Sequence, residues 1–247
     1  MASRPSLSAA SLIASPILVA VTAMTLVVAT RALVLFASHA DAFDLAASIE
    51  RGGAMPDATY LATFVKRNAL DRAITDCGDS FTRASLTINL ATMEAAGEND
   101  DAAATDVART NALRAAEHRL LCNPLDGNAW LRYAMIKSRG GGDPASVVED
   151  LRMSYWTAPS EGWIVEPRLV LATSLSLSGV SGFETEYLGD LRLYVSFEPA
   201  SRVAATFVVT SPVVRQQLRP LIDELPDGHK KTIIAEIDAL GVDYWQQ

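Results

Sequence analysis

The chain contains two cysteines and three histidines, which are the residue types best suited to redox and metal chemistry. Cys77 and Cys122 each stand at the end of a predicted helix, with one further helix between them. In an antiparallel array the first and third helices run parallel, so both cysteines fall at the same end. The spacing therefore permits a disulfide if the Cα atoms come within about 7 Å. Two unpaired, buried thiols are the alternative.

His118 and Cys122 are spaced i, i+4, which places them on one face of a helix and allows both to ligate a metal. Further candidate ligands in the neighbouring sequence are limited to Asp76 and Asp79, beside Cys77. A zinc site needs three or four ligands brought together. We therefore expect neither a metal site nor any other cofactor.

Motifs for nucleophilic or phosphate chemistry are absent from the sequence, which contains no Gly-x-Ser-x-Gly, Ser-x-x-Lys or His-Glu-x-x-His. The glycines 140–142 precede Asp143 and Pro144 but lack the preceding strand and the following lysine of a phosphate loop, so they favour a turn before a helix. The acidic run 98–101 lacks the ligand spacing of a calcium loop. We expect no catalytic residues, although a triad assembled from distant residues stays open as an alternative.

The composition describes a chain that can bury a core and carries no excess of basic surface. Of its 247 residues, 49% are hydrophobic, and 21 Lys and Arg stand against 29 Asp and Glu, for a net charge of −8. This balance disfavours a nucleic-acid partner, because binding to a phosphate backbone needs clustered cations. One large domain or two small ones fit this length.

The N-terminus has the composition of a membrane span. Residues 5–30 contain no charge, and residues 12–35 supply the roughly 20 apolar positions that cross a hydrocarbon core of about 30 Å. A cleaved signal peptide is the alternative, since Ala40-Asp41-Ala42 offers a small-x-small cleavage site. Either interpretation exports the rest of the chain. Positive residues at the two ends do not settle the orientation, but an anchor whose C-terminal domain lies outside the cytoplasm is the preferred prediction.

The region after residue 43 is predicted to be helical, because clusters of Gly, Pro, Asn and Asp separate most segments at helical length. Asp101, Asp126 and Asp143 can cap the helices that follow them, and Ser80 and Ser160 can do the same. Residues 84–90 alternate between apolar and polar types, which is strand periodicity. A lone strand would leave its edges unpaired, so a helix is preferred there as well.

Residues 123–159 resemble a tetratricopeptide repeat. That pattern has a tryptophan early in its first helix, then a large and a small residue, an apolar pair in the second helix, and a proline after it. The matching residues, which we expect in the repeat core, are Trp130, Tyr133, Ala134, Val147, Leu151 and Pro159. The turn is one residue longer than in the standard repeat, and Lys137 replaces the usual aromatic residue. The resemblance implies stacked helical hairpins.

Residues 151–171, especially 158–164 and Arg168, are also similar to membrane-anchored proteins of bacterial exopolysaccharide synthesis and export. This resemblance implies a cellular setting rather than a mechanism. The same stretch holds the candidate partner-binding residues Tyr155, Trp156, Trp163 and Arg168. Plain core packing is the alternative for the aromatic residues of this region.

Together these observations predict an all-α chain with two parts. Residues 1–42 form the membrane anchor, and residues 43–247 form an extracytoplasmic tetratricopeptide-like domain. The predicted function is that of a non-catalytic scaffold in a bacterial envelope assembly, held in the inner membrane by a single pass with its domain in the periplasm. Its partners would be envelope proteins and, through the N-terminal helix, the lipid bilayer. An envelope enzyme acting on glycan and a structural assembly subunit are the alternatives.

Overall fold

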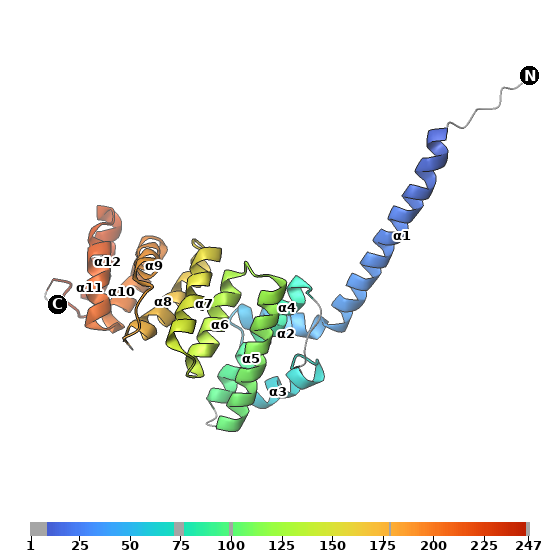
Figure 1. Ribbon diagram of the computed structural model, residues 1–247. Coiled ribbons are helices and arrows are strands. Elements are labelled where there is room, and N and C mark those ends of the chain that lie inside the picture. Colours follow the sequence, from blue (N-terminus) through green and yellow to red (C-terminus); the bar gives the residue numbers. More distant parts are fainter. Residues whose placement is uncertain (1–8, 72–76, 99–100, 178, 246–247) are drawn as a thin grey trace, which may run out of the picture.

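The computed structural model describes residues 9–71, 77–98, 101–177 and 179–245, and the regular secondary structure of these residues is entirely helical. This confirms the all-α class. The helices are α1 (Ala9–Ser38), α2 (Ala40–Glu50), α3 (Ala58–Arg67), α4 (Asp79–Gly97), α5 (Ala102–Cys122), α6 (Gly127–Arg139), α7 (Pro144–Thr157), α8 (Gly162–Leu177), α9 (Glu184–Phe197), α10 (Ala200–Val209), α11 (Pro212–Asp223) and α12 (Asp227–Ala239). From α2 onward they stack into an elongated array that ends at α10–α12, while α1 projects away from it (Figure 1).

Helix α1 extends beyond both ends of the predicted span of residues 12–35. Its described large apolar side chains are exposed, among them Leu18 and Met24. Measured over the described residues, no helix combines the length and apolarity needed to cross a membrane. The side chains at 9–17, 31–32 and 35–36 lie outside the described residues, and part of the predicted span falls there.

The helical array begins at α2, directly after a break at His39. Ala42 and Ala46 of α2 are buried in a cluster with Phe64 of α3 and Phe81 of α4. The packed array therefore starts with α2.

Helix α4 covers the residues with strand-like periodicity, so the preference for a helix is confirmed there. Helices α2, α3 and α5 all pack against α4. Because it is enclosed on several sides, α4 buries polar as well as apolar side chains, including Ser85, Asn89 and Thr92. Such burial removes the single apolar stripe of a surface helix and explains why the 3.6-residue period is weak in this segment.

The predicted caps hold at three helix starts. The side chains of Asp101, Asp126 and Asp143 accept hydrogen bonds from the backbone N–H three residues on, at 3.0, 3.0 and 3.2 Å. Pro144 occupies the first turn of α7, as expected after Asp143. Ser80 is not the cap of α4, because that helix already begins at Asp79 and has Gly78 at the cap position.

The predicted hairpin around residues 123–159 consists of α6 and α7, packed against each other across a short turn. Lys137, at the position where the repeat pattern has an aromatic residue, donates to Asp150 of α7 at 2.6 Å and lies over the Tyr133 ring at 5.0 Å. A charged side chain thus joins the two helices here. The next two helices, α8 and α9, also pack against each other.

The C-terminal half has the largest core cluster, which runs from α6 to the end of the chain. Tyr244 closes it, with no exposed area, a ring centroid 5.5 Å from that of Phe207, and hydroxyl hydrogen bonds to the Arg219 carbonyl and Asp223, both at 3.1 Å. Trp245 remains 69% exposed. The two neighbouring aromatic residues therefore differ, since Tyr244 is docked in the core and Trp245 is exposed to solvent.

Candidate functional site: a polar groove across α4, α6 and α8

A groove of about 610 Å³ lies along one side of the array, over the first helices of successive hairpins. The end of α2, one face of α4, the α5–α6 turn, the first turns of α6 and the start of α8 line it. Its ionisable lining residues are Glu50, Arg83, Glu94, Arg119, Asp126, Arg132 and Glu161. A concave surface of mixed charge on a rigid helical scaffold is suited to binding rather than to forming a closed reaction chamber.

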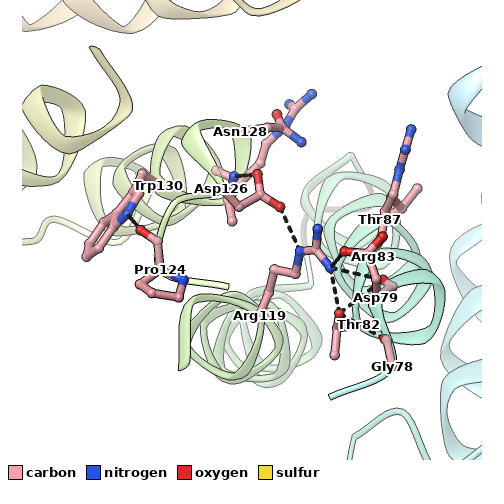
Figure 2. Close-up of polar contacts among 12 residues, drawn as sticks. Gly78, Asp79, Thr82, Arg83, Thr87, Arg119, Pro124, Asp126, Asn128 and Trp130 are labelled. Carbon is pink, nitrogen blue, oxygen red and sulfur yellow. Dashed lines mark hydrogen bonds and ion pairs between the residues drawn. The ribbon is translucent and has the colours of Figure 1, made fainter. Parts of the chain in front are cut away.

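Arg119 holds the floor of the groove together (Figure 2). Its Nε donates to Asp126 at 2.7 Å, and its Nη1 donates to the Asp79 carboxylate at 2.6 Å and to Thr82 at 2.8 Å. Asp126 caps α6, whereas Asp79 and Thr82 lie in the first turn of α4. One buried guanidinium therefore joins the C-terminal end of α5 to the starts of α4 and α6, and its charge is fully used within the chain.

Arg83 also forms an ion pair within the chain, with Glu50. It donates from Nε and Nη2 to the two carboxylate oxygens of Glu50, at 3.0 and 2.8 Å, and Thr87 donates to the same carboxylate at 3.1 Å. The hydrogen bonds that Arg83 donates to Glu50 raise the pKa of Arg83. This pair fastens α2 to α4 at the edge of the groove.

Arg132 differs from the other two arginines. Its Nε donates to Asn128 at 3.3 Å, one turn earlier on α6, but within the described part of the chain its guanidinium makes no ion pair. Burial lowers the pKa of Arg132, while Glu94 opposes that shift. The side chain stays charged, because arginine is not deprotonated in proteins. The groove therefore contains a partly desolvated cation with donors to spare.

Of the four candidate partner-binding residues, the structure exposes two. Trp156 is 70% exposed on α7, and Trp163 is 61% exposed at the start of α8, where it lines the groove together with Glu161. Tyr155 is buried and Arg168 has no exposed area, so neither side chain belongs to the surface that a partner meets. Tyr155 is therefore a core residue, as the alternative interpretation holds, whereas Trp156 and Trp163 lie outside the core.

Arg168 forms a buried ion pair with Asp190 instead. Its Nε and Nη2 each donate to one Asp190 oxygen at 2.8 Å, and its Nη1 donates to the carbonyl of Ala158 at 2.9 Å. The guanidinium carbon lies 4.5 Å from the centre of the Tyr155 ring. Burial raises the pKa of Asp190 to about 6, with Arg168 acting in the opposite direction. This pair ties α8 to α9 and to the end of α7.

Of the six residues predicted for the repeat core, three are buried, two are half-buried and one is exposed. Ala134, Val147 and Leu151 are at most 1% exposed. Trp130 and Tyr133 are half-buried against the α4–α5–α6 cluster, with the Trp130 Nε1 donating to the Pro124 carbonyl at 2.8 Å and Tyr133 donating to Glu117 at 3.2 Å. Pro159 is exposed, at the turn that ends the hairpin.

The two cysteines form a disulfide, with Cα atoms 5.2 Å apart. The bond joins Cys77, two residues before the start of α4, to the last residue of α5, beside the Arg119 contacts. The predicted pairing is therefore present. His118 also lies here, with its Nε2 3.6 Å from the Cys122 sulfur.

The carboxyl groups of the described residues do not form an acid–base pair in the groove. Burial raises the pKa of two of them, Asp150 and Asp190. Both are ion-paired, with Lys137 and Arg168 respectively, and neither lines the groove. The two carboxyls whose pKa is raised by burial therefore lie outside the groove.

Comparison with protein-family models, with curated proteins and with solved structures finds no match to this chain. The geometry of its own residues is therefore what defines the groove as a candidate site. Sequence reasoning missed Arg132, Asn128 and Glu161. The i, i+4 spacing of Asn128 and Arg132 was visible but is common on exposed helices, and nothing in the sequence showed that Arg132 would be left without an acidic partner.

Proposed function

We propose that this chain is a non-catalytic interaction subunit of a bacterial envelope assembly, held at the membrane by α1, whose groove binds an extended, anionic segment of a partner protein. The observation that carries the proposal is the Arg132 guanidinium, which makes no ion pair with the described residues, in a groove with an exposed tryptophan at its rim.

A bound partner would explain why Arg132 is partly buried but makes no ion pair with the described residues. A partly buried cation that makes no ion pair with the described residues loses hydration, and the hydrogen bond to Asn128 and the charge of Glu94 restore only part of what is lost. A carboxylate of a bound segment would accept hydrogen bonds from its terminal nitrogens, and such charge-assisted bonds are short and strong. Trp163 offers apolar area beside it, and Trp and Arg are the residue types that most often dominate binding energy. The ligand's anionic group and an adjacent apolar side chain would therefore be recognised together.

The membrane anchor is supported by the uncharged run 5–30 and by the exposed apolar side chains of α1, which would be covered by lipid. The disulfide supports an extracytoplasmic location for the array, because disulfides persist in oxidising compartments. The tetratricopeptide-like identity and the setting of polysaccharide synthesis or export rest on the sequence resemblance, and both are part of the proposal.

The groove is tested by comparative crosslinking in gently solubilised membranes. Full-length chains carrying Trp163→Ala or Arg132→Gln should lose the partner that the unchanged chain captures, while Trp245→Ala, an equally exposed tryptophan outside the groove, should keep it. Circular dichroism shows whether each variant remains folded. A partner retained by both groove variants would refute the assignment of the groove.

The anchor is tested by washing membranes at alkaline pH. The full chain should stay with the lipid, whereas a chain lacking residues 1–38 should be released. Release of the full chain in the same wash would contradict a membrane-spanning α1.

A further inference from the structure

The end of α5 holds a second cluster with chemistry of its own, outside the groove contacts used above. The ligand atoms of Cys77, His118 and Cys122 all lie within 4.8 Å of one another. Cys122 and His118 are one turn apart on α5, and Cys77 approaches from the segment before α4. Cys77 is exposed, so reagents in solution can reach the cluster.

The separation of His118 and Cys122 matches that of two ligands on one metal ion. A tetrahedral zinc ion bound at about 2.0 Å to nitrogen and about 2.3 Å to sulfur holds these two ligand atoms about 3.5 Å apart. The Nε2 of His118 lies 3.6 Å from the Cys122 sulfur. The histidine therefore does not need to move far to share an ion with that thiolate once the disulfide is open.

We propose that reduction of the Cys77–Cys122 disulfide creates a binding site for a thiolate-preferring cation of the Zn²⁺ type, with Cys77, Cys122 and His118 as ligands. A small thiol reduces the bond: two thiol molecules become one disulfide, and the chain gains two cysteine thiols. Zn²⁺ then binds the two sulfurs and His118, and both thiol protons are released to solvent. The ion keeps one open position for water or a ligand from another molecule.

Arg119 would hold the ligands together after the disulfide opens. It lies between His118 and Cys122 in sequence, and its Nη1 donates to the Asp79 carboxylate at 2.6 Å and to the Asp79 carbonyl at 2.9 Å. Asp79 is two residues from Cys77. This contact fixes the start of α4 against the end of α5 independently of the sulfur–sulfur bond, so the reduced thiols would stay in reach of one ion.

The site goes beyond the proposed binding function and does not depend on it. The test uses the full chain, reduced with a phosphine and then freed of reductant, with Co²⁺ as a spectroscopic probe for Zn²⁺. One Co²⁺ per chain should give thiolate-to-metal charge-transfer absorption and the visible bands of tetrahedral coordination. Zn²⁺ should displace it, and the oxidised chain should show none of these bands.

The ligand assignment is tested with variants. His118→Ala should weaken Co²⁺ binding by more than the roughly 10–100-fold that loss of a mere supporting partner causes, whereas His229→Ala, far away on α12, should bind as the unchanged chain does. Cys77→Ser/Cys122→Ser should abolish the charge-transfer band. In the unchanged, reduced chain, Zn²⁺ should protect both cysteines from alkylation and His118 from acylation, measured by mass spectrometry. Absence of charge transfer in the reduced chain, or an unaltered affinity in His118→Ala, would overturn the proposal.

Discussion

The two halves of the helical array are packed with side chains of different size. In the N-terminal half, α5 buries four alanines against its neighbours: Ala108, Ala112, Ala115 and Ala116. In the C-terminal half the core contains aromatic residues from several elements: Phe183, Tyr187, Tyr194, Phe207 and Tyr244. Small residues let helix backbones approach closely, whereas large ones remove more apolar area from water.

This difference explains where the polar and covalent links lie. The N-terminal half gains less from apolar burial, and it contains the disulfide, the Arg119 contacts and the Arg83–Glu50 pair. Besides the Lys137–Asp150 pair between α6 and α7, the C-terminal half has a large core that fully encloses the ion pair Arg168–Asp190. We therefore expect the first half to depend on its links and the second on its packing, except at that pair.

The largest effect is expected at the buried ion pair. Arg168→Met leaves the Asp190 carboxylate enclosed without its cation and should lower the free energy of unfolding by about 3–5 kcal/mol. Arg168→Met/Asp190→Leu should recover part of this loss, because it removes both charges. Chemical denaturation measures both values. Glu224→Gln, in the exposed pair with Arg192, is the control and should change stability by less than about 1 kcal/mol.

The same pair has a pH signature. Burial raises the pKa of Asp190 to about 6 in the folded chain, above its value of about 4 in the unfolded chain. A carboxyl shifted in this direction contributes stability that is complete below the unfolded pKa and is lost as pH rises through the folded one. Arg168→Met removes the cation that holds this pKa down, so the variant should lose more stability than the unchanged chain between acid and neutral pH. An equal loss in both would contradict this cause.

The second effect tests the N-terminal half. Cys77→Ser/Cys122→Ser removes a link between residues separated by 45 positions and should lower the free energy of unfolding by about 3–4 kcal/mol, by the loop-entropy estimate. Hydrogen exchange should show faster opening of α4 and α5, with α10 and α12 little changed. Equal loss of protection in both halves would mean that the array unfolds as one unit rather than as two parts of different character.

Local rules predicted much of this fold. The capping carboxylates Asp101, Asp126 and Asp143 marked helix starts, because a side-chain acceptor at that position satisfies a free backbone N–H. Cysteine position along successive helices predicted the disulfide. The caps could be predicted because they depend on residues within one helical turn. The disulfide could be predicted because it depends only on the number of helices between the two cysteines.

The burial and the partners of individual side chains depend on tertiary contacts, and the sequence did not predict them. Arg168 reads as an exposed residue in sequence because arginine is rarely buried, and only Asp190, on another helix, makes its burial tolerable. Arg119 and Arg132 both lie on helices. Nothing in the local sequence shows that Arg119 forms ion pairs with Asp79 and Asp126, whereas Arg132 forms none with the described residues. The groove is a product of how α4, α6 and α8 align.

The third effect tests the close approach of helices at the alanine-packed interface. Ala112 has no exposed area, so Ala112→Leu inserts side-chain volume between helices that have no space for it and should destabilise the chain by about 1–3 kcal/mol. Ala103→Leu, on the exposed start of the same helix, is the matched control and should change stability by less than about 0.5 kcal/mol. Thermal melts of the two variants provide the measurement, and similar values would mean that α5 packs loosely.

The smallest effect on stability is expected at Arg132, and the contrast with Arg119 sharpens the comparison within the groove itself. Arg119→Gln removes ion pairs to Asp79 and Asp126 and should lower stability by about 2 kcal/mol. Arg132→Gln removes one hydrogen bond to Asn128 together with a partly desolvated charge that makes no ion pair with the described residues, so these contributions oppose each other and the net change should stay within about 0.5 kcal/mol. If Arg132 serves a partner, the same substitution should abolish capture of that partner while the melting curve stays in place. A large loss of stability would instead identify Arg132 as a structural residue, and the groove would lose the cation on which its proposed function rests.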